Sequence, residues 1–274
     1  MLMKTAIFNS YIMFINNDKN SPLNCIFAPQ KIYLMKKLSI FLICSIFVTG
    51  VTAQDNDALS KHYLKVYRQA LNYNDANAAI NGLHNYIAIN NSVVYKDTLS
   101  MLYFNIKSYF SSLLLAEEVY KAAPDNLNAM ARTAECYDEL GDPKTAAVLY
   151  EQVVPKTKNP YHTYKLAICQ YQLKRTGESE ASAKVALADT SSKKIGVKFT
   201  QMGGIEQTVP VNAAAANLLG VLKMDTKDFA GAQANFKQAL TLYPDFAGAK
   251  DNLDMCEKNL KKAPVKSPAK PKGK

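Results

Sequence analysis

The sequence is poor in the residues and motifs of enzyme sites. It has three histidines: His62, His84 and His162. None of them belongs to an H-E-x-x-H motif, and none has a second histidine or cysteine at the short spacing typical of metal ligands. The glycine-rich motifs that bind phosphates or dinucleotides are absent from the sequence, as is the G-x-S-x-G motif of hydrolases. We therefore expect a protein that is not an enzyme and that holds no metal and no cofactor.

The central part of the chain also lacks a net charge. Residues 54–260 contain 22 basic and 22 acidic side chains, so the formal charge of +10 comes from the two ends. This balance gives no indication of a nucleic-acid partner. The lysine- and proline-rich residues 263–274 are predicted to form a disordered tail, which either contacts an anionic surface weakly or is a solvated terminus with no partner.

Residues 1–34 lack any regular hydrophobic period and are expected to be an unstructured extension, whereas residues 35–53 have the three parts of a secretory signal peptide. Two lysines precede an apolar run, and Val51-Thr52-Ala53 resembles a cleavage site. We expect the protein to start at Met35 and to be exported to the periplasm or the cell envelope. An uncleaved membrane anchor and a buried core helix are the alternatives, although the run is shorter than the roughly 20 residues of a membrane span.

Residues 54–262 have helical periodicity, which is clearest in Ala213–Asp245. There, Ala213–Met224 and Asp228–Leu242 place apolar side chains three and four residues apart, and this spacing predicts two amphipathic helices. A small residue stands on each helix, Gly220 on the first and Ala232 on the second, as a close approach of the helices requires. One such pair cannot bury both faces of its helices, so at least about three stacked pairs are expected.

Weaker copies of this stretch lie upstream. The residues that take the position of Gly220 in the three upstream copies follow one another at intervals of 34 and then 33 residues. The small residues of the copies are Ser100, Ala134 and Ala167 in the position of Gly220, and Ser112, Ala146 and Ser179 in the position of Ala232.

The spacing of Leu219-Gly220, Ala232, Phe236 and Pro244, together with this period, resembles the tetratricopeptide repeat. The resemblance departs from the family pattern at the first-helix tryptophan, since Ala216 stands in its place. It implies an all-α fold: an α-solenoid of about five helix pairs over residues 54–262, including a faint first pair. Residues 246–262 have one apolar and one polar face and are predicted to be the closing helix of the array.

The period is interrupted between the fourth and fifth pairs. Ala167 and Gly220 are 53 residues apart, and in residues 193–212 two stretches of alternating apolar residues flank a glycine-containing loop. This pattern predicts an inserted β-hairpin. It either touches a partner through Phe199, Met202 and Ile205 or packs as a flap over neighbouring helices, and we favour the flap narrowly.

Three cysteines fall at equivalent places of the predicted units: Cys136, Cys169 and Cys256. Equivalent places in stacked units are about 10 Å apart, which is more than a disulfide spans. We therefore predict three buried free thiols, even in an oxidising compartment.

The family resemblance implies that the first helix of each pair lines a concave channel that binds a peptide or a partner helix. The channel lacks the Lys/Asn clamp of the members that bind chaperones, so we do not expect that class of partner. The partner-binding candidates, carried over by position, are Met101, Phe104, Arg132, Glu135, Asp138, Tyr164, Lys165, Ile168, Tyr171, Asn217, Val221 and Met224.

An acidic cluster lies within this lining. Glu135, Asp138 and Glu139 share one face of a predicted helix, where a solvated acidic ridge is the favoured interpretation and a groove for a basic partner segment is the alternative. The function that we predict is a non-catalytic protein–protein interaction scaffold of the cell envelope. The alternative is a module that captures a glycan or peptide in an aromatic groove around Tyr161, Tyr164 and Tyr171.

Overall fold

The structure is a computed structural model that describes residues 55–200, 204 and 206–262. It divides into two compact units, Met1–Asp57 and Ala58–Lys274, and the second unit contains the repeats. The predicted signal peptide, the extension before it and the basic tail lie outside the described residues. Among the described residues no helix is both long and apolar enough to cross a membrane.

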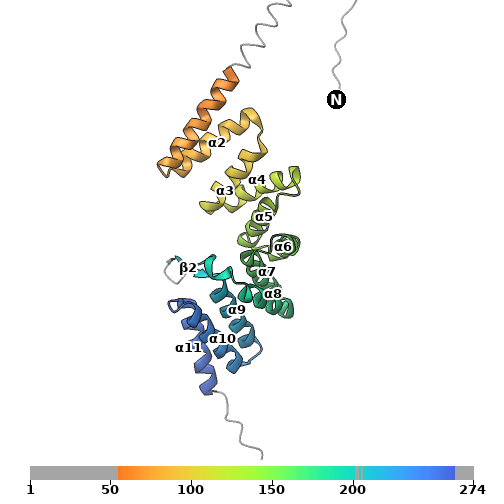
Figure 1. Ribbon diagram of the computed structural model, residues 1–274, viewed down its shortest axis with the longest axis vertical. Helices are drawn as coiled ribbons and strands as arrows, with labels where there is room; N and C mark the ends of the chain where they lie inside the picture. Colours follow the sequence, from red (N-terminus) through yellow and green to blue (C-terminus); the bar gives the residue numbers. More distant parts are fainter. Residues whose placement is uncertain (1–54, 201–203, 205, 263–274) are drawn as a thin grey trace, which may run out of the picture. The chain divides into compact units, whose positions relative to one another are not determined.

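Five helix pairs and a closing helix make up the described part of the second unit (Figure 1), so the predicted solenoid architecture is confirmed. Each helix packs mainly against the helices that precede and follow it in sequence. The pairs are residues 55–72 with α2 (Ala76–Asn90), α3 (Val93–Asn105) with α4 (Tyr109–Ala122), α5 (Leu127–Glu139) with α6 (Pro143–Thr157), α7 (Pro160–Gln172) with α8 (Thr176–Ala188), and α9 (Val211–Asp225) with α10 (Phe229–Leu242), and α11 (Ala247–Lys262) closes the array.

Short polar side chains start many of these helices. Asp75, Asn126, Asp142, Asn159 and Asp228 stand at the N-cap positions of their helices, and each side chain accepts a hydrogen bond from a backbone N–H of the first turn. These bonds satisfy donors that have no partner within the helix. The sequence therefore defines the helix starts locally, before any contact between repeats is made.

The turn inside each pair has a residue in the left-handed backbone conformation. The φ angles are 55° at Asn74, 61° at Lys107, 84° at Gly141, 61° at Lys174 and 60° at Lys227. Only Gly141 adopts this conformation without a steric penalty from a Cβ atom. The turn geometry is thus repeated in all five pairs, although the residue type is not.

The predicted small positions are close helix contacts. Ser100, Ala134, Ala167, Ser112, Ala146, Ser179 and Ala232 all have exposed fractions of 0%. At Gly220 a Cβ atom would overlap the ring of Phe236, so the close contact of this position is with the Phe236 ring. The register of the repeats is therefore confirmed by packing.

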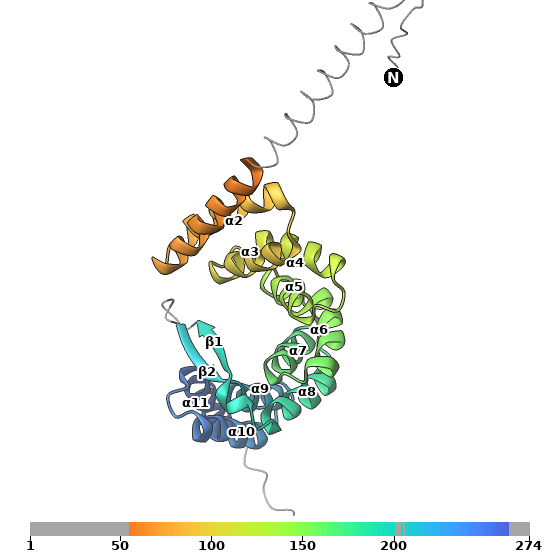
Figure 2. The same cartoon turned by 45° about the horizontal axis from the view of Figure 1, so that its top comes forward.

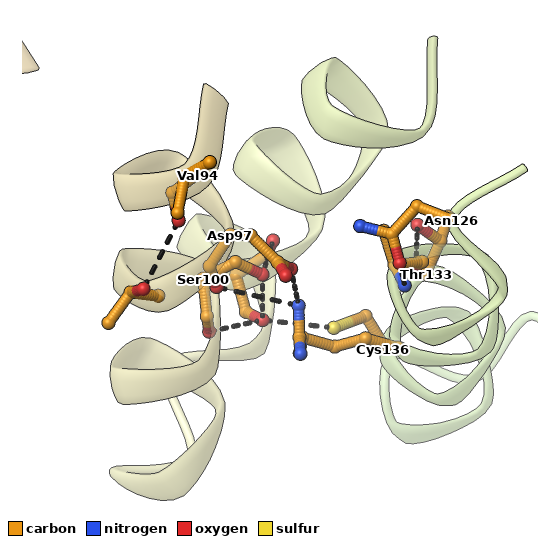
Figure 3. A network of polar contacts seen from close by, with 10 residues as sticks. Val94, Asp97, Ser100, Asn126, Thr133 and Cys136 are labelled. Carbon is orange, nitrogen blue, oxygen red and sulfur yellow. Dashed lines mark hydrogen bonds and ion pairs between the residues drawn. The ribbon is translucent and has the colours of Figure 1, made fainter. Parts of the chain in front are cut away.

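Two of the small positions in the second pair are serines that bond to each other (Figure 3). Ser100 Oγ donates to the carbonyl oxygen of Ser112 at 2.9 Å, and Ser112 Oγ is 2.8 Å from the carbonyl oxygen of Ser100. Cys136 Sγ lies 3.3 Å from Ser112 Oγ and links this pair to α5. Serine fits these positions because its hydroxyl is small and bonds to the carbonyl of the facing helix, as Ser179 also does at Ala167, over 2.8 Å.

The predicted β-hairpin is present between the fourth and fifth pairs. A 3-10 turn, η1 (Ser192–Lys194), leads into strand β1 (Gly196–Thr200), which pairs with the antiparallel strand β2 (Glu206–Pro210). Val197 faces Val209 across the strands, and both are buried in the same core cluster as residues of α7 and α9. Pro210 ends β2 directly before α9, a place where a residue without a backbone N–H is tolerated.

Candidate functional site

The candidate site is the surface of the first helices α3, α5, α7 and α9. Figure 2 shows these helices on one side of the stack, with α4, α6, α8 and α10 on the other side. The hairpin extends from α9 on the side of the first helices (Figure 2). All twelve partner-binding candidates lie on the first helices, and the structure does not test whether they bind a partner.

On α5 and on α7, the side chain two residues before the small position binds the first helix of the preceding repeat. Arg132 on α5 forms an ion pair with Asp97 on α3, which is labelled in Figure 3. Lys165, in the same position on α7, has its Nζ 2.6 Å from an oxygen of Asp138 on α5. Arg132, Asp138 and Lys165 therefore hold neighbouring repeats together, a role that the sequence interpretation did not give them.

The Lys165–Asp138 pair is largely shielded from solvent. Its side chains are 11% and 6% exposed, and Glu139 adds a second carboxylate 3.5 Å from the Lys165 amine. Burial lowers the pKa of Lys165, but the nearby charges of Asp138 and Glu135 outweigh it, so its pKa lies above the ordinary value. The lysine is thus a permanent cation between two repeats.

Glu135 stands one helical turn before this pair. It accepts a hydrogen bond from the hydroxyl of Tyr161 on α7. Burial raises the pKa of Glu135, and the lowering effects of Lys165 and of the Tyr161 hydrogen bond do not fully offset it. The carboxylate is therefore held in a poorly solvated contact between α5 and α7.

These contacts correct the interpretation of the acidic cluster. A solvated acidic ridge was expected at Glu135, Asp138 and Glu139, but only Glu139 is well exposed. The ridge interpretation is wrong for Glu135 and Asp138, because residues 26 and 27 positions later in the sequence, Tyr161 and Lys165, pack against them. Helical periodicity within one repeat carries no information about the side chains of the next.

The tyrosines of the predicted aromatic groove differ in exposure. Tyr164 is buried at 4% exposure, and Tyr161 uses its hydroxyl to bind Glu135. Tyr171 is half-buried, and the Lys174 amine lies 5.6 Å from its ring centre. Tyr164 is therefore not available as a surface for a ligand, and Tyr171 is the most accessible of the three.

The apolar and amide candidates lie nearer the surface. Met101 on α3 is 45% exposed, and Phe104 packs edge-on against Tyr109 with ring centres 5.3 Å apart. Asn217 on α9 accepts a hydrogen bond of 2.9 Å from Asn252 on α11, which continues the links between first helices. The remaining candidates, Ile168, Val221 and Met224, are partly buried against neighbouring core clusters.

The hairpin is attached to the array along its strands. Phe199 packs against Phe246, next to α11, with ring centres 5.0 Å apart and the ring planes tilted. The other two hairpin candidates, Met202 and Ile205, lie outside the described residues. At the far end of β2, Glu206 Oε1 lies 2.5 Å from the amine of Lys107, in the turn between α3 and α4.

The sequence gives no signal for the Lys107–Glu206 contact. The two residues are 99 positions apart and belong to the second repeat and to the insertion. The insertion itself is visible as a break in the period, but its direction depends on how the repeats stack. Lys107 and Glu206 are thus among the residues of this surface that the sequence interpretation missed.

Within the described ranges no group of three or more His, Cys, Asp and Glu side chains could hold a metal ion. His84 is instead bonded to the Tyr103 hydroxyl at 2.6 Å. Cys136, Cys169 and Cys256 are buried free thiols, as predicted, and burial raises the pKa of Cys136 to about 11 and that of Cys169 to about 12.

Comparison with known proteins agrees with this architecture. The family model of the tetratricopeptide repeat matches residues 128–154, which span most of α5 and α6. No curated protein sequence matches the chain significantly.

Several solved structures share the fold. A tetratricopeptide repeat protein from Parabacteroides merdae superposes with a TM-score of 0.60 at 11% identity, over 75% of each chain. A MamA fragment from Desulfovibrio magneticus gives 0.56 at 15% identity over 69% of this chain and 97% of that one. YrrB, described as a TPR protein with an unusual peptide-binding site, gives 0.57 at 13% identity over 75% and 96%. The repeat register, the family match and these structures together show that the chain has the fold of tetratricopeptide repeat proteins.

Proposed function

We propose that this protein is a non-catalytic interaction scaffold and that it binds an amphipathic helix or an extended peptide on the face of its first helices. The observation that carries the proposal is that α3, α5, α7 and α9 lie on one side and present partly exposed apolar and aromatic side chains there, with Met101 at 45% exposure. Such a surface suits the apolar side of a partner segment. The peptide-binding site for which YrrB is described supports the same use of this fold.

The proposal includes export to the cell envelope. It rests on residues 35–53, whose basic, apolar and small-residue parts have the order of a signal peptide. Mass analysis of the protein isolated from its native cells tests this: a mature chain that begins at Gln54 supports export with cleavage. A chain that keeps residues 35–53 and stays in the cytoplasmic fraction contradicts it. Weak contact of residues 263–274 with an anionic surface remains a prediction.

Site-specific photo-crosslinking tests the binding surface. A photoreactive amino acid replaces Met101 on the first-helix face, and in a control chain it replaces Val148 on α6, which has a similar exposure of 51%. We expect one protein to be crosslinked at Met101 and not at Val148. Crosslinks that form only at Val148 would contradict the proposal, because the partner would then bind the second helices.

The same experiment separates the alternative function. A ligand-capture module would give a crosslink to a glycan or a small peptide near Tyr171 and none to a protein at Met101. The structure favours the scaffold, because Tyr161 and Tyr164 are engaged in contacts between repeats. Loss of a captured protein in a Met101→Asp variant, with folding retained, would give further support to the scaffold.

A further inference from the structure

The pairing of the two hairpin strands determines where the backbone groups of β1 point. The Val211 N–H donates to the carbonyl oxygen of Ile195 at 2.9 Å, so these two residues form a hydrogen-bonded pair at the base of the hairpin. Bonded and non-bonded pairs alternate along an antiparallel ladder. The N–H and C=O groups of Gly196, Lys198 and Thr200 therefore point away from β2, to the outer edge of β1.

This outer edge of β1 is open. Among the described residues the sheet consists of β1 and β2 alone, so no further strand lies beside β1. In the same part of the chain, the backbone groups of Gly196, Lys198 and Thr200 have no hydrogen-bond partner outside the hairpin, and all three residues are exposed. A row of unpaired N–H and C=O groups on an exposed edge is a template for another strand.

The edge of β2 is less suited to such pairing. This strand ends in Pro210, which has no N–H to donate. The side chain of Gln207 donates to the carbonyl oxygen of Asp245 at 2.6 Å and accepts from the Ala247 N–H at 3.3 Å. The segment before α11 therefore lies against β2, and β1 is the strand with the more accessible edge.

Lysines surround the open edge. The side chain of Lys198 is 75% exposed, and the exposed Lys193 and Lys194 of η1 lead directly into β1. Glu206, the acidic residue among the described strand residues, already has two cations near it, with the amine of Lys107 at 2.5 Å and that of Lys198 at 3.7 Å. The charge at this edge is complementary to a strand that carries carboxylates.

Lys198 also argues against pairing between two copies of this chain. Antiparallel pairing of two β1 strands about Lys198 would place like charges directly opposite each other, which is destabilising. Lysine on an edge strand is a common protection against such self-association. It favours an acidic strand instead, whose carboxylate would face the amine.

We propose that β1 binds an extended acidic segment of a partner protein by strand addition, with the backbone of that segment paired to Gly196, Lys198 and Thr200 and a carboxylate facing Lys198. Main-chain hydrogen bonds provide affinity in this mode of recognition, and side chains provide selectivity. The hairpin is held in place by the buried Val197 and Val209, so the edge is formed before the peptide arrives. The inference goes beyond the proposed function, because this surface is not the face of the first helices.

A labelled synthetic peptide of alternating glutamate and valine tests the proposal, with binding to the full chain followed by fluorescence anisotropy. One control peptide has lysine in place of each glutamate. In the other, every backbone nitrogen is methylated, so the side chains remain and the N–H donors are lost. We expect the acidic peptide to bind several-fold more tightly than either control. Absence of binding, or equal binding of the methylated peptide, would overturn the proposal.

Amide hydrogen exchange then locates the bound peptide in the unaltered chain. When the acidic peptide is added, exchange at the Lys198 and Thr200 amides should slow several-fold. The matched control is the Thr208 amide, which lies opposite Lys198 in the register and points to the outer edge of β2. Slower exchange at Thr208 with no change at Lys198 would place the peptide on β2 and would contradict strand addition to β1.

Two proline variants test the edges separately. Thr200→Pro removes an outward N–H from β1 and Thr208→Pro removes one from β2, and neither N–H takes part in the bonds between the strands. We expect Thr200→Pro to weaken peptide binding several-fold and Thr208→Pro to bind like the parent chain. An equal loss in both would count against β1 as the binding edge. Urea unfolding checks that both variants fold, and if either does not, the exchange measurement on the unaltered chain decides.

A Met101→Ser variant distinguishes this surface from the face of the first helices. It should bind the acidic peptide as the parent chain does, because Met101 lies on α3. Loss of peptide binding in this variant would place the peptide on the first-helix face, which would overturn strand addition and support the proposed function instead.

Discussion

Gly220 and Phe236 together set the distance between α9 and α10. A Cβ atom at Gly220 would overlap three atoms of the Phe236 ring, which is itself fully buried. We predict that Gly220→Ala lowers the free energy of unfolding by about 1 to 3 kcal/mol, because the ring must leave its packed position. Urea unfolding followed by circular dichroism measures this change.

Gly177 on α8 is the matched control for that substitution. A Cβ atom there would meet no atom within 4 Å, and alanine is the better helix former. Gly177→Ala should therefore keep or slightly raise stability. An equal loss in both variants would mean that the backbone of the helix, and not the contact with Phe236, determines the result.

Glu135 and Glu117 are two carboxylates that accept a tyrosine hydroxyl but respond to pH in opposite ways. Burial raises the pKa of Glu135, so its contribution to stability is lost as the pH rises through that raised pKa. The hydrogen bond from Tyr137 lowers the pKa of Glu117, so its contribution is lost as the pH falls through that lowered pKa.

Substitution by glutamine separates these two effects, because the glutamine side-chain oxygen still accepts a hydrogen bond from the tyrosine hydroxyl but the side chain carries no charge. We predict that Glu135→Gln gains stability relative to the parent chain as the pH rises from about 4 to about 7, across the ordinary range of a glutamate pKa. Glu117→Gln should lose stability relative to the parent over the same range. Denaturant unfolding at several pH values measures both differences, and parallel trends in the two variants would contradict the assigned directions.

At the scale of the element, the recurring feature is the turn within each helix pair. Five turns place one residue at positive φ, and in four of them this residue is asparagine or lysine. A lysine there carries steric strain that glycine does not have. These turns therefore lower the stability of the fold slightly, and a substitution by glycine would relieve the strain.

Exchange of residue type at two turns measures that strain. We predict that Lys227→Gly raises the free energy of unfolding by up to about 1 kcal/mol and that Gly141→Ala lowers it by a similar amount. The Gly141 variant has room for its Cβ atom, since nothing lies within 4 Å of that position, so its loss reports backbone conformation alone. Changes of the same sign in both variants would be inconsistent with this explanation.

The sequence predicts these elements better than it predicts the site. Small residues at Gly220, Ala167 and Ala134 specify the register, and the alternation around Val197 and Val209 reveals the hairpin, because both patterns are local. The Lys165–Asp138 pair could not be predicted, since it depends on how one repeat stacks on the next. The same limit made the acidic ridge look solvated, and it hid the contact between Lys107 and Glu206.

On the scale of the whole molecule, the repeats form a stack in which stability is shared between neighbours. The helices α5 and α7 have packed neighbours before and after them, whereas α11 packs against α10 and only slightly against α9. In such arrays the terminal element opens more readily than the central ones, because it loses only one interface on opening. The Lys107–Glu206 ion pair adds a contact between the hairpin and the second repeat, but exposed pairs of this kind contribute little to stability.

The three buried thiols allow this order of opening to be observed. Cys136 lies on α5, Cys169 on α7 and Cys256 on α11, and burial raises the pKa of all three, so each reacts slowly until its helix opens. We predict that Cys256 reacts with a thiol reagent before Cys136 and Cys169 in low denaturant, with peptide mass analysis assigning each site. Equal rates at the three sites would show that the array opens as one cooperative unit. Faster reaction at Cys136 would show that the stack is weakest in its centre, which contradicts the contacts of Arg132 and Lys165 that join α5 to its neighbours.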